Sequence, residues 1–238
     1  MSKKIIFRYN SIDEDINYPG LIAAKKTIPE WYKKIPSYLK QRDGLKNFGR
    51  DLSTIKKCMP FFEGLTFGYM LTLPFDIFVE STTEEARISW QVNIPEGSIE
   101  VEKEERVPGL ILPDEYSKQP IRLNLFPSII TPKGHSILIT HPINRYDLPF
   151  YTFGAVVDSD YSGMQIGVTM LFKKDFNGII EKGTQIAQII PFKRDDWLVE
   201  KGDVKTKEDL SKEIFGLTST IKNAYVKNFW HKKNFNWL

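Results

Sequence analysis

Apolar and polar residues alternate or form short apolar runs along the middle of the chain, from Phe67 to Phe192. Alternation with period two is typical of half-buried strands, and short apolar runs rich in β-branched and aromatic residues are typical of fully buried ones. Turn-forming residues separate the runs, and no helical spacing interrupts them. The pattern predicts strands at residues 69–73, 75–79, 87–92, 121–126, 135–140, 152–157, 165–172 and 185–192. Strands at this spacing indicate an antiparallel barrel or sandwich, and thus a mainly β protein.

The two flanks of this β region follow different patterns. Before it, the sequence predicts a strand at 5–9, a helix that begins at Pro29 and a short helix over 56–64. After it, a capping box and a helical repeat of apolar residues predict a long amphipathic helix; these residues are Thr206 and Asp209, then Leu210, Ile214, Leu217, Ile221 and Tyr225. We therefore divide the chain into irregular N-terminal decoration (1–66), a β domain (67–200) and a C-terminal helix with a basic, aromatic tail (201–238).

Composition and charge add a few constraints. The 33 basic and 30 acidic residues give a net charge of +3, which is too small to indicate nucleic acid as a partner by itself. The apolar run after Met1 is too short for a signal peptide, and no run approaches the ~18 residues of a membrane span. The single cysteine, Cys58, excludes an internal disulfide, and we expect it to be buried. We therefore expect a soluble cytoplasmic protein with no membrane partner.

Two segments carry the candidate chemistry. Residues 156–163 read Val-Val-Asp-Ser-Asp-Tyr-Ser-Gly, an acidic and aromatic turn between two predicted strands. Residues 182–190 read Lys-Gly-Thr-Gln-Ile-Ala-Gln-Ile-Ile, a glycine-led strand with one polar residue in an apolar run. This pair resembles the third and fourth motifs of dUTPases, and it implies the β-clip fold that dUTPases and dCTP deaminases share. Homotrimers are usual among dUTPases, so the resemblance also implies a homo-oligomer.

The resemblance implies a role for each matching residue. Asp158 matches the aspartate that orients or deprotonates the attacking water, and Tyr161 matches the tyrosine that stacks on uracil and deoxyribose. Gly163 would allow a ligand to approach the backbone closely, and Gln188 would reach a phosphate or a neighbouring subunit. The residues alone also support another interpretation, in which Asp158 belongs to a hairpin turn whose acidic side chains bond their own backbone. Tyr161 would then pack on the hairpin, and Gln188 would be structural.

The other motifs of the family are absent or altered. Where the second motif supplies a serine and backbone amides to the phosphates, this chain has His141-Pro142-Ile143-Asn144-Arg145. Arg145 could pair with an anionic ligand, and His141 or Asn144 could form a hydrogen bond with it. The aspartate of the first motif and the glycine-rich tail of the fifth have no counterpart, so we do not expect dUTP hydrolysis. We expect no protein metal site, because His135 and His141 lack further ligands, and magnesium only together with a nucleotide.

A second resemblance covers more of the chain. Gly134 to Arg145 and Gly183 to Phe192 are similar to the patterns G-[HY]-S-x-L-x-x-H-P-x-N-R and G-T-x-I-A-Q-x-I-P-F of uncharacterised phage and bacterial proteins. Frequent Lys, Ile, Asn and Phe residues are also typical of low-GC genomes and bacteriophages. The resemblance implies such a source, with the host cytoplasm as the location of a phage protein, but it implies no function.

Three functions remain open from the sequence. The first is a β-clip protein that binds a nucleotide or related small anion near His141, Asn144, Arg145, Asp158 and Tyr161. The second is a nucleotide pyrophosphatase or deaminase, which requires Asp158 in a cleft with Arg145 or Lys193-Arg194 near the same ligand. The third is a phage structural or assembly protein, which predicts a filled hairpin and an apolar oligomer surface. The basic, aromatic C-terminal tail could bind single-stranded nucleic acid, but we favour the packing of its rings on the β domain.

Overall fold

The computed structural model describes residues 4–8, 20–39, 52–102, 108–161, 165–218 and 224–231. The chain divides into two compact units, and each is built from two separate stretches of sequence. The first unit comprises Met1–Thr27 and Leu65–Arg194, and the second comprises Ile28–Gly64 and Asp195–Leu238. The predicted β domain over 67–200 therefore corresponds to most of the first unit, but that unit also includes strands from the start of the chain.

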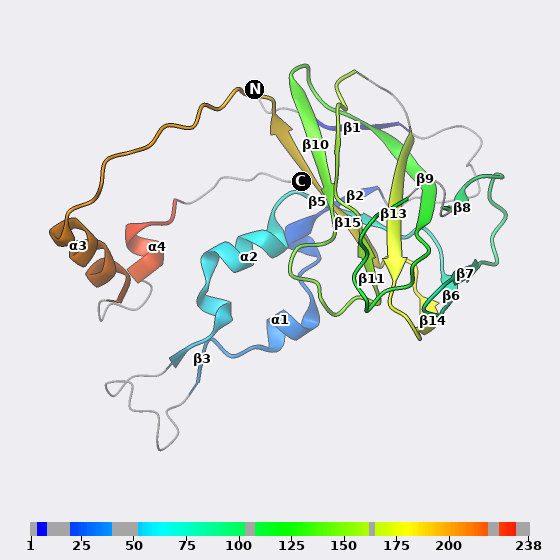
Figure 1. The fold of residues 1–238 in the computed structure, drawn as a ribbon, viewed down its shortest axis with the longest axis horizontal. Helices are drawn as coiled ribbons and strands as arrows, with labels where there is room; N and C mark the ends of the chain where they lie inside the picture. The colour runs from blue at the N-terminus through cyan, green and yellow to red at the C-terminus, as the bar shows by residue number, and fades with distance from the viewer. Residues whose placement is uncertain are drawn as a thin grey trace. The chain divides into compact units, whose positions relative to one another are not determined.

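The described residues of the first unit form three antiparallel sheets (Figure 1). One sheet has the order β1-β9-β13-β11, with β8 also paired to β9. Its strands are β1 (Ile6–Arg8), β8 (Ile99–Val101), β9 (Ile121–Ile130), β11 (Phe150–Thr152) and β13 (Gln165–Phe172). The second sheet has the order β12-β10-β15-β5-β2. Its strands are β12 (Ala155–Val157), β10 (His135–Thr140), β15 (Gln185–Lys193), β5 (Tyr69–Thr72) and β2 (Leu21–Ala23).

The third sheet has three strands in the order β14-β6-β7. They are β14 (Asn177–Ile180), β6 (Ile77–Ser81) and β7 (Ala86–Ser89). Along β6, Ile77, Val79 and Ser81 are buried while Phe78 and Glu80 are exposed, as period-two alternation requires of a strand with one covered face. One face of this sheet therefore belongs to the core, and the other carries exposed side chains.

A single hydrophobic core joins the three sheets. Ile77 comes from β6, Leu123 from β9 and Ile137 from β10, and each is at most 1% exposed. Each buried aliphatic side chain of this size contributes ~1.5–3 kcal/mol of transfer free energy. The sheets therefore stabilise one another through the apolar faces that the alternation of residues creates.

The second unit is mainly helical in its described parts. Its elements are α1 (Glu30–Lys34), the β3–β4 hairpin strands (Tyr38–Leu39 and Leu52–Ser53), a 3₁₀ turn (Ile55–Lys57), α2 (Met59–Thr66, which ends in the first unit), α3 (Lys207–Thr218) and α4 (Ala224–Asn228). Tyr32 of α1 is 3% exposed, and its ring stacks on Phe61 and Phe62 at centroid distances of 6.0 and 5.9 Å. The indole N–H of Trp230 donates to Glu63 Oε1 at 2.8 Å, so a partly buried hydrogen bond links the two stretches of this unit.

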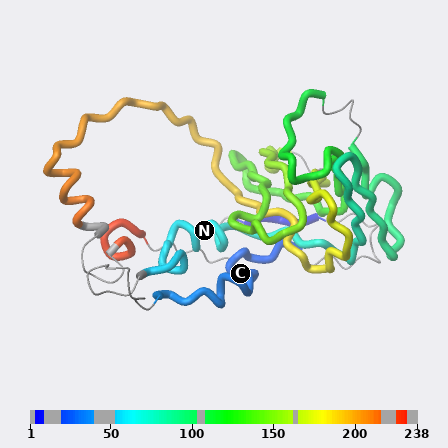
Figure 2. Tube along the Cα trace, turned by 60° about the horizontal axis from the view of Figure 1, so that its bottom comes forward, coloured from blue at the N-terminus to red at the C-terminus, as the bar shows by residue number. Residues whose placement is uncertain are grey.

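An extended segment, residues 195–206, leads from β15 to α3 without helix or strand, and we call it the arm (orange in Figure 2). Trp197, Leu198 and Val199 follow one another in the arm and are 85%, 97% and 101% exposed. Large apolar side chains in such a run are uncommon on the surface of a soluble domain. The arm is therefore the most exposed apolar stretch of the described chain.

The structure confirms several sequence predictions and corrects others. The protein is mainly β with antiparallel strands, as predicted, although among the described residues the sheets are open and the expected barrel is not seen. Thr206 caps the predicted helix, because the Asp209 amide donates to Thr206 Oγ1 (3.2 Å), but the Asp209 carboxylate accepts from the Thr206 hydroxyl (2.8 Å) and not from its amide as a full capping box requires. The helix that it starts ends at Thr218, and residues 219–223 lie outside the described residues. The expectation that Cys58 is buried is wrong, because Cys58 is exposed.

Candidate functional site

The predicted site residues lie at the two ends of β10. Near the start of this strand, β12 brings Val157 opposite Ile137 and so places Asp158 and Tyr161 beside that end. His141 and Arg145 follow the other end of the strand. A strand of six residues spans about 20 Å, so the two groups are too far apart to hold one small ligand between them.

At the start of β10, the Asp160 carboxylate accepts more hydrogen bonds than that of Asp158. Its side chain is 6% exposed, and its carboxylate accepts the Gly134 amide at 2.7 Å and two guanidinium N–H groups of Arg194 at 2.6 and 2.9 Å. The hydrogen bond from Arg194 is the main cause that lowers the Asp160 pKa to about 2. The same pairing raises the pKa of Arg194. This bidentate pair connects the loop after β12 to the end of β15.

Asp158 belongs to the same cluster but faces solvent. Its Oδ1 accepts hydrogen bonds from Ser136 Oγ (2.7 Å) and from Arg194 Nη1 (3.2 Å), and its side chain is 69% exposed. A general base works best at the rim of a water-excluding pocket with a free lone pair toward its proton donor. Asp158 is instead held among polar neighbours in an exposed turn, although Arg194 lies within reach as the enzyme hypothesis requires.

The turn between Asp158 and Asp160 is filled by hydrogen bonds of its own. Ser159 is 1% exposed, and its hydroxyl lies 2.7 Å from that of Thr131, which in turn donates to the His135 carbonyl. The Tyr161 ring is 95% exposed, so it does not pack on the hairpin as the alternative interpretation suggested. Gly163 lies outside the described residues. This end of β10 is thus a closed polar cluster beside one exposed aromatic ring.

At the second end, His141 uses both of its ring nitrogens within the fold. Nδ1 accepts the Thr152 amide at 3.3 Å, so Nε2 carries the proton and donates to the Arg145 carbonyl at 3.0 Å. The ring stacks on Tyr151 at 5.0 Å between centroids. Burial is the main cause that lowers the pKa of His141, partly opposed by the hydrogen bond to the Arg145 carbonyl. His141 is therefore held neutral as a structural link between the loop and β11.

Arg145 also donates to nearby side chains, Asp147 of the same loop and Gln185 of β15. Its Nε and Nη2 donate to the two carboxylate oxygens of Asp147 at 2.8 and 2.9 Å, and its Nη1 donates to Gln185 Oε1. The side chain is 11% exposed. Asn144 has a positive φ of 62°, and the next amide, that of Arg145, closes a turn onto the Pro142 carbonyl. The guanidinium is oriented by these contacts and offers little surface to an anion.

Gln188 lies in β15 opposite Thr140 and is completely buried. Its Oε1 accepts the Ile143 amide at 2.8 Å, and its Nε2 donates to the Phe67 carbonyl at 2.6 Å. The Gln188 side chain thereby hydrogen-bonds the Ile143 amide of the loop after β10 and the Phe67 carbonyl before β5. These contacts agree with the structural interpretation of Gln188 and leave it no route to a phosphate.

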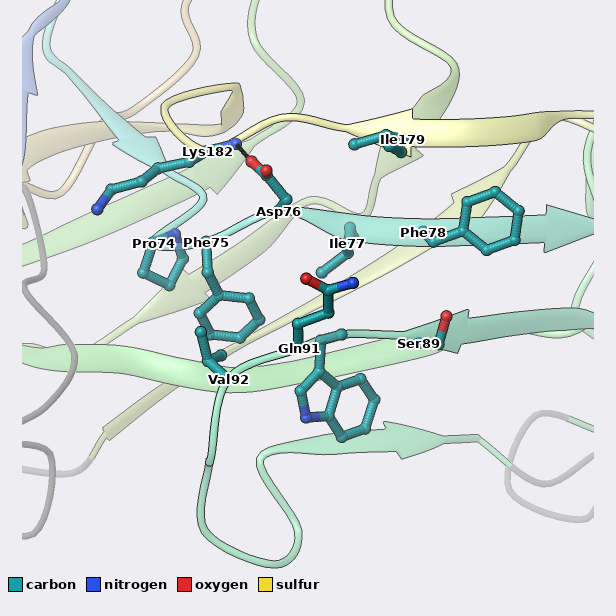
Figure 3. Close-up of a pocket in the computed structure, with 11 residues that line it drawn as sticks. Pro74, Phe75, Asp76, Ile77, Phe78, Ser89, Gln91, Val92, Ile179 and Lys182 are labelled. Atoms are coloured by element: carbon teal, nitrogen blue, oxygen red, sulfur yellow. Dashed lines mark hydrogen bonds between the residues drawn. The ribbon is translucent and has the colours of Figure 1, made fainter.

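Sequence reasoning missed a groove in the third sheet, between the start of β6 and the end of β7. It has a volume of about 480 Å³, and its lining includes Phe78, Trp90, Val92, Ile179 and Lys182. Figure 3 shows Phe78 on β6 between Ile179 on β14 and Ser89 on β7. The outward alternation of Phe78 in β6 was a usable signal, but β14 was not predicted as a strand. We call this feature the Phe78 groove.

Comparisons with known proteins do not assign this chain to a family. No protein-family model matches the sequence, and no curated protein sequence is significantly similar to it.

In the part of the chain that the structure describes, no three His, Cys, Asp or Glu side chains gather as metal ligands would. None of the helices in the described ranges has the length and apolar character that a membrane crossing needs. The function must therefore be inferred from the geometry itself.

Proposed function

We propose that this protein is a non-catalytic assembly protein whose β unit is a scaffold of β-clip type. The polar atoms of the candidate site support the fold: Asp158 and Asp160 hold Arg194, and both nitrogens of His141 hold backbone groups. The assembly hypothesis predicts a filled hairpin, whereas the enzyme hypothesis requires Asp158 to face a cleft. The geometry therefore favours assembly over catalysis.

The observation that carries the proposal is the exposed apolar run in the arm. Trp197, Leu198 and Val199 are 85–101% exposed in the single chain. Burying a side chain of this kind contributes ~1.5–3 kcal/mol relative to leaving it in water. A surface that covers all three would contribute ~4.5–9 kcal/mol, which is of the same order as the ~4–15 kcal/mol that association costs. Association of this chain with copies of itself, as the dUTPase resemblance implies, would supply such a surface.

A second candidate function is the binding of a nucleotide or a related small anion. The specific observation in its favour is the ring of Tyr161, which is 95% exposed beside the Arg194 cluster. It occupies the position at which the dUTPase resemblance expects a ring that stacks on a base. Magnesium would enter such a site with the nucleotide. The basic, aromatic stretch that the sequence associates with single-stranded nucleic acid runs from Lys222 to Trp237, and the structure describes only residues 224–231 of it.

Two measurements on the purified full chain separate these functions. Analytical ultracentrifugation over a hundredfold range of protein concentration should give a mass that is a multiple of the monomer. A thermal-shift panel of ribo- and deoxynucleotides, with and without magnesium, should leave the melting temperature unchanged. A monomer at every concentration would contradict assembly with copies of itself. A nucleotide that raises the melting temperature of the wild type but not of Asp158→Ala or Tyr161→Ala would instead support the second function.

A further inference from the structure

The imidazole of His141 closes one edge of strand β11. Among the described strands, β11 pairs with β13 alone, so its other edge has no neighbouring strand. The Phe153 amide, which follows β11, donates to the Thr169 carbonyl of β13, and the alternation of an antiparallel ladder turns the Thr152 amide to the opposite edge. There it donates to Nδ1 of His141 at 3.3 Å. The ring nitrogen therefore takes the place of a carbonyl oxygen from a further strand.

The same hydrogen bond joins two sheets. His141 follows β10 of the second sheet, whereas Thr152 belongs to the first. On the side of the loop, Nε2 donates to the Arg145 carbonyl at 3.0 Å, and on the side of β11 the ring stacks on Tyr151. The Thr152 hydroxyl adds a second link, because it donates to the Ile186 carbonyl of β15. Of these two hydrogen bonds from Thr152 to the second sheet, one depends on a group that titrates near neutral pH.

Protonation of His141 removes the acceptor from this contact. A neutral imidazole has one acceptor nitrogen, and a proton on Nδ1 converts it into a second donor. The N–H of the imidazolium would then point at the N–H of Thr152, which is 0% exposed and has no water to accept its bond. A buried donor without a partner is costly. The charged ring must therefore move away from β11.

The charged groups around the ring act on the same equilibrium. The loop contributes Arg145 and Asp147, and Lys173 follows β13; β11 contributes the uncharged ring of Tyr151. Burial, the largest cause, and the charges of Arg145 and Lys173 lower the pKa of His141 below 6.5, whereas the Arg145 carbonyl and Asp147 oppose them. The Asp147 carboxylate already accepts two guanidinium N–H groups of Arg145 at 2.8 and 2.9 Å. The closed arrangement therefore resists the proton.

We propose that His141 is an acid-sensitive cap on β11, whose protonation frees the Thr152 amide and loosens the loop of residues 141–149 from the first sheet. This inference goes beyond the proposed function and does not depend on whether the chain assembles. The opening is local, because Gln188 still holds the Ile143 amide and ties the loop to the second sheet. Opening lets His141 bind its proton with an ordinary pKa of 6.5. From that pH down to the lowered pKa of the closed form, the ratio of open to closed chains rises up to ~tenfold per pH unit.

Hydrogen exchange of single backbone amides tests the cap in the ¹⁵N-labelled full chain. Exchange is followed by NMR at several pH values from 7.5 to 5, and each rate is corrected for the chemical exchange rate at that pH. The protection of the Thr152 amide should fall by up to ~tenfold per pH unit below 6.5. The amides of β9 should keep their protection, because this strand does not touch the cap. Unchanged protection at Thr152, or an equal loss in β9, would overturn the proposal.

Two matched substitutions assign the effect to one ring. His141→Gln keeps an acceptor and a donor but does not titrate, so its Thr152 protection should be equal at pH 7.5 and pH 5. His135→Gln removes the histidine at the other end of β10 and should keep the pH dependence of the wild type. A pH dependence that survives in His141→Gln would contradict the cap.

If His141→Gln does not fold, the wild-type ring decides. The NMR titration of the His141 ring should then have its midpoint below 6.5, and the ring signals should change together with the exchange of the Thr152 amide. A His141 ring that gains its proton while the Thr152 amide stays protected would overturn the proposal.

Discussion

Gln188→Ala gives a sharp test of the structural interpretation of the predicted site. The substitution removes the acceptor for the Ile143 amide and the donor for the Phe67 carbonyl from a fully buried position. Each buried polar group left without a partner costs ~1–3 kcal/mol. Because Ile143 and Phe67 are themselves only partly buried, water can reach them in part, and we take the lower half of that range for each. Together with the lost packing of the side chain, we expect the free energy of unfolding to fall by about 3 kcal/mol.

The assay is urea unfolding of the full chain followed by circular dichroism. Gln165→Ala is the matched control, because Gln165 is an exposed glutamine at the start of β13 and should lose less than ~0.5 kcal/mol. Gln188→Glu keeps the acceptor for Ile143 but turns a carboxylate toward the Phe67 carbonyl, so it should be less unstable at acidic pH, where the protonated acid can donate. A loss below ~1 kcal/mol for Gln188→Ala would refute the reasoning.

Three further predictions concern backbone strain and titration. Gly68→Ala should lower the free energy of unfolding by roughly 2 kcal/mol or more, because φ is +73° and an added Cβ would lie 2.4 Å from the Ile189 carbonyl oxygen. Gly183→Ala should lower it less in the same urea assay, because Gly183 has φ +85° but no neighbour within 4 Å of the added Cβ. The Asp160 pKa is lowered to about 2 from 3.8, so the stability that Asp160 contributes is present above pH 3.8 and is lost as the pH falls toward 2. The stability difference between wild type and Asp160→Asn should therefore shrink over that window; an unchanged difference would contradict it. Because the His141 pKa is lowered from 6.5, stability should fall as the pH drops below 6.5, and His141→Gln should flatten this slope in thermal melts from pH 7.5 to 5.

Much of the first unit followed from the sequence because alternation and turn residues are local signals. The predicted strands at 135–140 and 165–172 match β10 and β13 residue by residue. The prediction for 152–157 was wrong in one respect, since β11 ends at Thr152 and β12 begins at Ala155. β14 was missed because Asn-Gly-Ile-Ile is a weak local strand signal. It becomes a strand through pairing with β6, about one hundred residues earlier in the chain.

The candidate site was harder to predict, because its contacts join residues that are far apart in sequence. The turn at Asp158 was predicted, but the Asp160–Arg194 pair depends on β10 lying between β12 and β15. In the same way, the partners of Gln188 come from two loops that the sequence treats as unrelated. A motif states which residue types are present, whereas the fold decides which of their polar atoms remain available to a ligand. Catalytic and ligand-binding roles at Asp158, His141, Asn144, Arg145, Tyr161 and Gly163 stay predictions.

The pairing of β1 with β9 also has a consequence during synthesis of the protein. Ile6 leaves the ribosome before its partner in the sheet, Ile130, which is made roughly 120 residues later. At ~5–20 residues per second, the first strand waits on the order of ten seconds for its neighbour. Until then its backbone and apolar side chains are open to wrong pairing, which makes the nascent chain a natural client for chaperones that bind short apolar segments.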